Sequence, residues 1–312
     1  MRTKSDTAYV RWLVMGVVCL VSLFIVVWHF RQDAGPTRQL ALKASRVDLV
    51  GQMQLALASA SEAEKSAVLA ITDLDSQRFA EQARAASVDV ERERKELESL
   101  LATGGSQREK ELLAQFSEAF GKLQRIDEEV LGLAVRNTNL KAYGLLFGAA
   151  ADTLAEMDAA LSRVLAKRAD SPDAKRVMNS AFGARIGVLR IQTQLAPHIA
   201  EESDEKMDQM EASMRKEELQ VQEDLDALAA LTKTEVASDV TTASSRFVHY
   251  REIKTRILAL SRENTNVRSL ALSLNQKRKA MLVCLDALSG LKQAVLDEPI
   301  AGVTYGRPAK PR

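Results

Sequence analysis

The chain has 312 residues, a formal net charge of +1 and only 4% aromatic residues. A nucleic-acid-binding protein would show a basic face or a pI above about 9, so this charge balance excludes nucleic acid as an expected partner. Abundant Ala, Leu, Glu, Lys, Arg and Gln with sustained helical periodicity favour an all-α protein of long helices. Cys19 and Cys284 form no disulfide framework and no zinc-binding pattern.

An apolar run near the amino end predicts a transmembrane signal anchor. Residues 12–30 approach the roughly 20 apolar residues that cross a bilayer, and Tyr9, Trp12 and Trp28 suit its two interfaces. A cleaved signal peptide is an alternative, but the run exceeds the usual ~7–15 residues and no small-x-small site follows it closely. Lipidation of Cys19 is a second alternative, which the continuing apolar run disfavours.

The charges beside this run bear on its orientation in the membrane. Residues 1–11 form a short predicted cytoplasmic tail whose basic residues favour the amino end inside, while other basic residues beyond the run oppose it: Arg31, Arg38, Lys43 and Arg46. A short amino tail before a long polar domain is the usual layout of a signal anchor. We therefore expect a single-pass protein of the bacterial inner membrane, with the remaining chain in the periplasm.

The turn signal Asp33-Ala-Gly-Pro36 precedes a first expected helix that spans about 37–102. Glu64 falls on or near the apolar face of this helix, and we expect it either to reach solvent with its charged end or to pair across helices, rather than to be a functional carboxylate. The break at 103–106 leads into the capping box Ser106-Gln-Arg-Glu109, which predicts the start of a second helix that reaches about residue 168.

A third helix is expected from about 173 to 231, with Ser171 as its cap. Pro197 interrupts its interior and predicts a kink, and His198 is expected to be partly exposed beside that kink rather than a metal ligand. A fourth helix is expected over about 239–296. Residues 298–312, rich in Pro, Gly and basic residues, are expected to be a disordered basic tail.

One motif occurs twice in the sequence. Leu133-Ala-Val-Arg-Asn-Thr-Asn-Leu-Lys141 is echoed by Leu260-Ser-Arg-Glu-Asn-Thr-Asn-Val-Arg268. In each copy an asparagine, Asn137 or Asn264, lies on the alternating three-four spacing of a buried helical seam. We therefore expect a duplicated helical hairpin, with repeats at about 37–169 and 173–297, folded into an antiparallel up-down-up-down four-helix bundle.

Two interpretations of this motif are open. A buried asparagine pair costs stability but fixes the register and oligomeric state of a bundle, which is the default interpretation. Alternatively, the polar layer and the Pro197 kink form a ligand site in which basic side chains hold an anion. The candidate residues of this layer are Asn137, Asn264, Thr138, Thr265, Arg136 and Arg268, with Lys141 beside them.

Motifs that carry catalysis or bind cofactors are absent from the sequence. It contains no Glu-x-x-His pair for a di-iron bundle and no Cys-x-x-Cys-His for covalent haem. A phosphate-binding loop and a Gly-x-Ser-x-Gly motif are also lacking. We therefore expect no cofactor, no metal and no enzyme activity.

Residues of about 37–297 resemble the four-helix-bundle ligand-sensing module of methyl-accepting chemotaxis receptors. The signal anchor, the hairpin pairs and the repeated motif carry the resemblance, together with an Ala-rich stretch at 63–70 and its echo at 195–200. The resemblance implies an extracytoplasmic input domain that binds small molecules or partner proteins.

Receptors of that family continue through a second membrane helix into a HAMP coupling domain and a signalling hairpin, whereas this chain stops after the fourth expected helix. We therefore expect a stand-alone module that acts in signal transduction through a membrane receptor or kinase, with a homodimer as a further expectation. A structural coiled-coil spacer or scaffold of the cell envelope is the alternative function.

Overall fold

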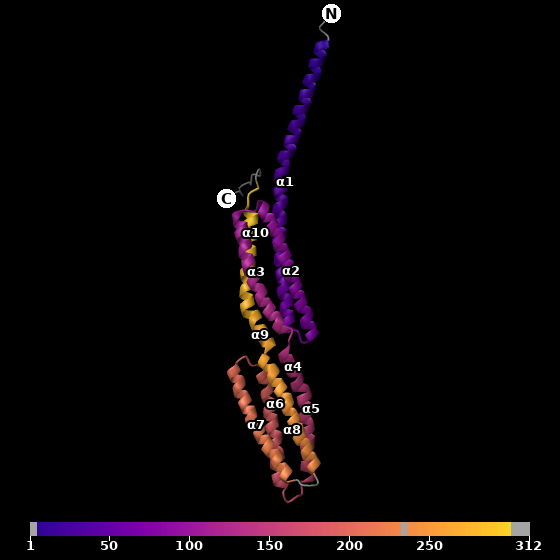
Figure 1. Ribbon diagram of the computed structural model, residues 1–312, viewed down its shortest axis with the longest axis vertical. Coiled ribbons are helices and arrows are strands. Elements are labelled where there is room, and N and C mark those ends of the chain that lie inside the picture. Colours follow the sequence, from indigo (N-terminus) through magenta and orange to yellow (C-terminus); the bar gives the residue numbers. More distant parts are fainter. Residues whose placement is uncertain (1–4, 232–235, 301–312) are drawn as a thin grey trace, which may run out of the picture. The chain divides into compact units, whose positions relative to one another are not determined.

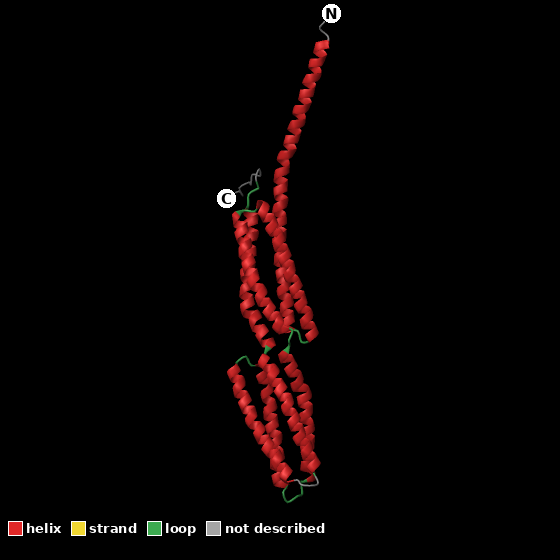
Figure 2. Ribbon diagram, in the orientation of Figure 1, coloured by secondary structure: helices red, strands yellow, loops and turns green. Residues whose placement is uncertain are grey.

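A computed structural model of the chain describes the backbone of residues 5–231 and 236–300, and the side chains of residues 37–231 and 236–300. Throughout these residues every regular element is helical, and short loops join the helices (Figure 2). The predicted all-α class is therefore confirmed.

The helices follow one another closely along the chain (Figure 1). In order they are α1 (Ser5–Leu69), α2 (Asp73–Gly104), α3 (Gln107–Ala134), α4 (Thr138–Leu145), α5 (Ala151–Lys167), α6 (Ala174–Ala200), α7 (Asp204–Leu231), α8 (Ala237–Glu263), α9 (Thr265–Leu272) and α10 (Arg278–Asp297). Two π-helical turns, η1 (Leu146–Ala150) and η2 (Ser273–Lys277), join α4 to α5 and α9 to α10.

Across the residues with described side chains, no helix combines the length and the apolar character needed to cross a membrane. The predicted tail at 1–11 and the predicted anchor at 12–30 lie outside those residues, as do residues 301–312 of the predicted basic tail.

The prediction of one continuous helix over 37–102 is wrong, because one helix ends at Leu69 and another starts at Asp73. The Thr72 hydroxyl accepts a hydrogen bond from the Asp75 backbone N–H at 3.1 Å and donates to the Asp75 carboxylate at 2.8 Å. This side-chain cap satisfies one of the free N–H groups of the first turn of α2. Thr72 therefore starts a new helix where the apolar periodicity alone predicted a continuous one.

The third expected helix, over 173–231, is also interrupted, at residues 201–203. Pro197 lies in the last turn of α6, and Glu201 adopts an extended conformation with φ −79° and ψ 139°. The Glu201 carboxylate accepts the backbone N–H groups of Glu202 and Ser203, both at 3.0 Å. The expected kink is therefore a helix end, after which α7 returns alongside α6 (Figure 1).

The predicted breaks at 103–106 and 170–173 are confirmed. Ser106 and Glu109 form the predicted capping box, with the Glu109 N–H donating to the Ser106 hydroxyl at 3.3 Å and the Ser106 N–H donating to the Glu109 carboxylate at 2.6 Å. Ser171 is not the cap of α6, because its hydroxyl donates to the Arg168 carbonyl at 2.9 Å and α6 begins at Ala174.

The chain divides into two compact units. The first unit is the described part of residues 1–60, 84–123 and 279–312, and the second unit is residues 61–83 and 124–278. Each unit therefore takes segments from both of the expected repeats, 37–169 and 173–297.

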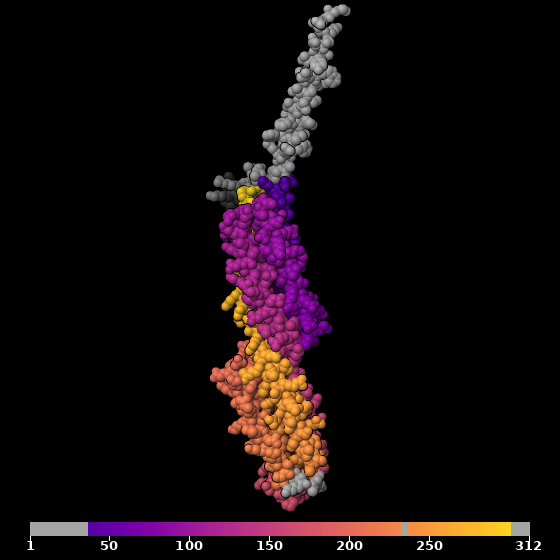
Figure 3. All heavy atoms as spheres, in the orientation of Figure 1, coloured from indigo at the N-terminus to yellow at the C-terminus, as the bar shows by residue number. Residues whose placement is uncertain are grey.

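One hydrophobic core fills the first unit. It gathers fully buried side chains from α1, α2, α3 and α10, including Met53, Leu97, Phe116 and Leu288. Figure 3 shows atoms of α10, in yellow, emerging beside those of α3, in magenta, although the two helices are far apart in sequence. Burial of these apolar side chains is the main favourable contribution to the stability of this unit.

The second unit contains a larger core between η1, α5, α6, α7 and α8. Leu146, Ile191, Met214 and Phe247 are among its fully buried members. Two smaller clusters join the end of α1 to its neighbours, one around Ala67 and Leu131 and the other around Val68, Val130 and Ala134. The repeated motif lies in this unit, and the neighbouring helices hold it in place.

Candidate functional site

The second and fourth expected helices are not continuous, because Asn137 interrupts the second and Asn264 interrupts the fourth. Asn137 and Asn264 are the non-glycine residues with positive φ in the described chain, with φ 49° and 51° and ψ 39° in both. Asparagine enters this left-handed region more readily than most L-residues. Each asparagine carbonyl also accepts the first bond of the next helix, from Lys141 N–H and Arg268 N–H respectively, both at 3.0 Å. Both residues are therefore helix junctions as well as buried polar groups.

The helices that start at these junctions cap each other. Thr138 N–H donates to the Thr265 hydroxyl at 3.1 Å, and Thr265 N–H donates to the Thr138 hydroxyl at 3.1 Å. The two hydroxyl oxygens lie 3.2 Å apart. An N-cap ordinarily comes from the residue just before its own helix, whereas here each cap comes from the other copy of the motif, 127 residues away.

The second asparagine of each Asn-Thr-Asn segment, Asn139 or Asn266, forms reciprocal bonds of the same kind. Asn139 N–H donates to the Asn266 side-chain oxygen at 3.2 Å, and Asn266 N–H donates to the Asn139 side-chain oxygen at 3.1 Å. The amide nitrogens then cross the layer, from Asn139 to Asn264 at 2.7 Å and from Asn266 to Asn137 at 2.9 Å. Sequence reasoning left Asn139 and Asn266 out of the candidate site, although both stand in the repeated Asn-Thr-Asn motif.

Further hydrogen bonds attach this polar layer to the end of α6 and to the start of α2. The Asn139 amide donates to the Ile199 carbonyl at 2.6 Å, and the Asn264 amide donates to the Glu201 carbonyl at 2.7 Å. At the start of α2, the Asn137 amide donates to the Asp73 carboxylate at 3.0 Å. This bond, with a second from Lys141, holds the pKa of Asp73 below its ordinary value.

With these bonds, each side-chain nitrogen and oxygen of the four asparagines and two threonines has a hydrogen-bond partner. Buried polar groups that are fully paired specify one arrangement of the surrounding helices. This pairing supports the register-setting interpretation, and binding of a ligand by these residues stays a prediction.

The basic residues of the predicted anion site are not drawn into the layer. Arg136 is half exposed and pairs with Glu263, and Lys141 pairs with Asp73 at 3.2 Å. Arg268 is exposed. The structure thus brings together Asn137, Thr138, Asn264 and Thr265 of the six predicted residues and leaves the two arginines at the surface.

His198 is fully buried, which corrects the expectation of a partly exposed side chain. Its Nδ1 lies 2.8 Å from the Ser261 hydroxyl and its Nε2 lies 3.1 Å from the Glu211 carboxylate, which also accepts a bond from Arg262 at 2.8 Å. Burial lowers the pKa of His198, and the bond to Glu211 opposes that shift. Because Ser261 is fully buried too, this Ser-His-Glu arrangement joins α6, α7 and α8 and offers no access to a substrate.

A buried cluster of three ionisable side chains joins α1, α3 and η2. Lys277 Nζ lies 2.8 Å from the Glu64 carboxylate and 2.9 Å from the Asp127 carboxylate. Of the two expected placements of Glu64, pairing across helices is therefore confirmed, because the side chain is buried and does not reach solvent. Its second oxygen, Oε1, is buried and has no hydrogen-bond partner.

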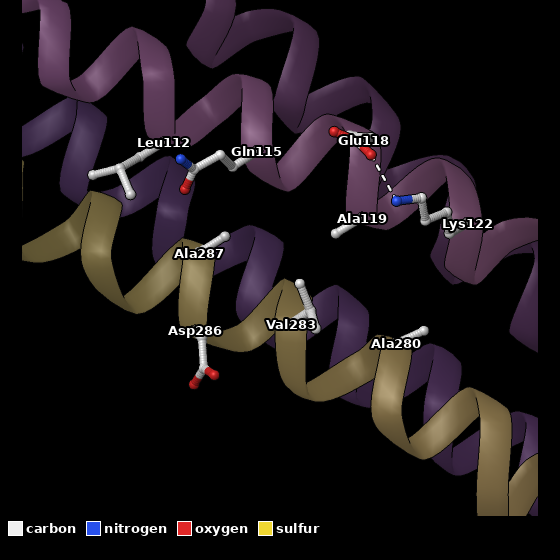
Figure 4. A pocket seen from close by; sticks show the side chains of 9 residues that line it. All are labelled: Leu112, Gln115, Glu118, Ala119, Lys122, Ala280, Val283, Asp286 and Ala287. Atoms are coloured by element: carbon white, nitrogen blue, oxygen red, sulfur yellow. Dashed lines mark hydrogen bonds and ion pairs between the residues drawn. The ribbon is translucent and has the colours of Figure 1, made fainter.

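An open groove runs between α3 and α10 in the first unit, with a volume of about 490 Å³ (Figure 4). Its apolar lining consists of Leu112, Ala119, Ala280, Val283 and Ala287. The groove's polar residues lie on both helices: Gln115, Glu118 and Lys122 on α3, and Asp286 on α10. Glu118 and Lys122 pair with each other at 2.6 Å, and Asp286 points away from α3 (Figure 4).

The second unit has a smaller groove between α5 and α6, of about 270 Å³. Leu154, Leu161, Val188 and Leu189 line it, with the pair Asp158 and Arg185 beside them. Leu189 is 58% exposed, so apolar surface continues from this groove onto α6. Neither groove is lined by the Asn-Thr-Asn residues. The sequence matches no protein-family model and no curated protein.

Proposed function

We propose that the chain is a membrane-anchored extracytoplasmic sensory or binding module that acts in signal transduction through a partner protein. The groove between α3 and α10 is the observation that carries the binding role. Ligand sites are concave, mostly apolar and about 300–1,000 Å³ in volume, with a few polar groups that orient the ligand. The α3–α10 groove has this size and lining, so its ligand is a small, largely apolar molecule.

The anchor and the arrangement of helices are part of this proposal. Residues 12–30 hold the module in the bacterial inner membrane, and the amino end lies in the cytoplasm. Residues 37–169 and 173–297 are two copies of one helical hairpin, which together form an antiparallel up-down-up-down four-helix bundle. The reciprocal bonds across 127 residues support a duplication, as do the matching π-helical turns at η1 and η2. We propose no catalytic activity for the chain. Its proposed partners are a membrane receptor or kinase and a second copy of the chain.

The test uses the full chain in detergent and a library of small metabolites. A ligand of the groove raises the melting temperature of the wild-type protein, because it binds the folded state. Val283→Arg replaces an apolar lining residue by a charge and abolishes that rise. Val248→Arg is the matched control, since Val248 is 50% exposed on α8 and Val283 is 56% exposed on α10. A library that shifts neither protein, or a shift that Val283→Arg retains, contradicts the binding role.

The alternative function, a structural spacer or scaffold of the envelope, has an observation of its own in its favour. The asparagine and threonine side chains of the polar layer are bonded to one another and to backbone groups, as a register-setting layer requires. The Asn137→Leu/Asn264→Leu double variant separates the two functions. If it abolishes the ligand-dependent shift, the layer takes part in sensing. If no compound in the library raises the melting temperature of either the wild-type protein or the double variant, the spacer function is favoured.

A further inference from the structure

The cluster of Glu64, Asp127 and Lys277 holds two acidic groups and a single ammonium group. Lys277 and Glu64 are 2% and 0% exposed, and Asp127 is 8% exposed. Full ionisation would leave this buried site with one uncompensated negative charge. An uncompensated charge in the interior costs several kcal/mol, so such groups usually shift their pKa and become neutral instead.

The hydrogen bonds of the cluster agree with this charge count. Lys277 Nζ forms a hydrogen bond with Glu64 Oε2 at 2.8 Å. Glu64 Oε1 and Asp127 Oδ1 are both buried; Glu64 Oε1 has no donor, and the single donor group near Asp127 Oδ1 is the same ammonium group, at 2.9 Å. A carboxylate is stabilised when donors saturate its oxygens, and the available donors are too few for two carboxylates.

We propose that Asp127 keeps its proton in the folded protein to a pH above the ordinary range of aspartate, so that the cluster then contains one ion pair and one neutral carboxyl group. Glu64 then remains the partner of Lys277. Loss of the proton adds a negative charge between α1, α3 and η2 and weakens their attachment. The cluster therefore makes the packing of α1, α3 and η2 sensitive to pH. This inference does not depend on the role of the groove in binding.

The charges around Asp127 come from each element that packs against it. Lys277 on η2 favours the ionised carboxylate, while Glu64 on α1 and Glu128 on α3 itself oppose it. Burial is the largest effect, and it raises the pKa of Asp127 above its ordinary value. A carboxyl group with a raised pKa in the folded state stabilises the fold most at low pH. That contribution is lost as the pH rises through the folded-state pKa.

Carboxyl ¹³C NMR of the full chain labelled at aspartate tests the proposal directly. Asp127→Asn removes one resonance and so assigns it, and Asp127→Glu serves the same purpose if the asparagine variant does not fold. We expect the Asp127 carboxyl to titrate well above the ordinary value of about 3.9 for aspartate. A midpoint at or below that value overturns the proposal.

Thermal unfolding across pH gives an independent readout. Asp127→Asn keeps the side chain neutral at every pH, so we expect its melting temperature to rise relative to the wild type as the pH increases above about 4. Glu118→Gln is the control. Lys122 lowers the pKa of the exposed Glu118, so the melting temperature of this variant should fall, not rise, relative to the wild type as the pH increases. An Asp127→Asn variant that loses stability relative to the wild type at high pH, or shows no change with pH, overturns the proposal.

Discussion

Thr138 and Thr265 cap each other's helices: the backbone N–H of each donates to the other's hydroxyl at 3.1 Å. Both residues are buried, at 4% and 1% exposure, so water cannot replace either bond. The two bonds tie the starts of α4 and α9 to each other. Residues 127 positions apart therefore depend on one another for the local stability of their helices.

The first prediction concerns one of these caps. Thr138→Val keeps the shape of the side chain but removes the acceptor for Thr265 N–H. A buried donor without a partner costs about 1–3 kcal/mol, and we expect the free energy of unfolding to fall by that amount in urea. Thr255→Val is the control, because the Thr255 hydroxyl is exposed and bonds to the Arg251 carbonyl. Equal effects of the two substitutions would show that the reciprocal cap contributes nothing.

A second prediction isolates the left-handed backbone of Asn137. Asn137→Gly and Asn137→Ala both remove the side-chain amide, but only glycine adopts φ near 49° without strain. We expect the alanine variant to be less stable than the glycine variant by about 1–2 kcal/mol, the usual cost of this conformation for an L-residue. Chemical denaturation of the two variants measures that difference. A more stable alanine variant would mean that residue 137 lies in an ordinary helix.

The third prediction is a pH dependence that originates at His198. Burial lowers the pKa of His198 below its ordinary value of about 6.5, so the folded state favours the neutral imidazole. The stability that it contributes is present above pH 6.5 and is lost as the pH falls through the folded-state pKa. We expect His198→Gln to lose less stability than the wild type between about pH 7 and pH 5. Parallel stability curves for the two proteins would contradict this assignment.

A pair of glycines gives the fourth prediction. A Cβ atom at Gly187 would lie 2.5 Å from Val221 Cγ2, whereas one at Gly121 would meet no atom within 4 Å. We expect Gly187→Ala to destabilise the protein by about 1–3 kcal/mol through overpacking between α6 and α7. Gly121→Ala should stabilise it by about 0.5–1 kcal/mol, because alanine favours a helix interior. Thermal unfolding of both variants tests the closeness of α6 and α7, and a stabilising Gly187→Ala would contradict it.

The sequence predicts the helical class, the end of a helix near Gly104, the start of another near Ala174 and the importance of the repeated motif. Local patterns determine these features. Periodicity and the capping box at Ser106 depend on residues within a few positions of one another. The repeat also predicts that Asn137 and Asn264 lie in one polar layer, but not that each bonds to the second asparagine of the other copy, Asn266 or Asn139, instead of to its counterpart.

The other features depend on contacts distant in sequence. Apolar spacing continues through residues 70–72, so the helix end at Leu69 was missed, although Thr72-Asp-Leu-Asp75 carries a capping signal. His198 is buried by Ser261 and Glu211, and Ser261 lies 63 residues away. The Asp127 pairing with Lys277 likewise joins α3 to a distant π-helical turn. None of these partners is marked by a local motif.

The most direct test of the polar layer is a cross-link between its two halves. Thr138→Cys/Thr265→Cys places thiols where hydroxyl oxygens now lie 3.2 Å apart. We expect mild oxidation of the full chain to join the two residues within one molecule, detected as a linked peptide pair by mass spectrometry. Thr193→Cys/Thr241→Cys, at two exposed positions near opposite ends of α6 and α8, should give no such peptide. Absence of the 138–265 link in folded protein would contradict the reciprocal capping on which this account depends.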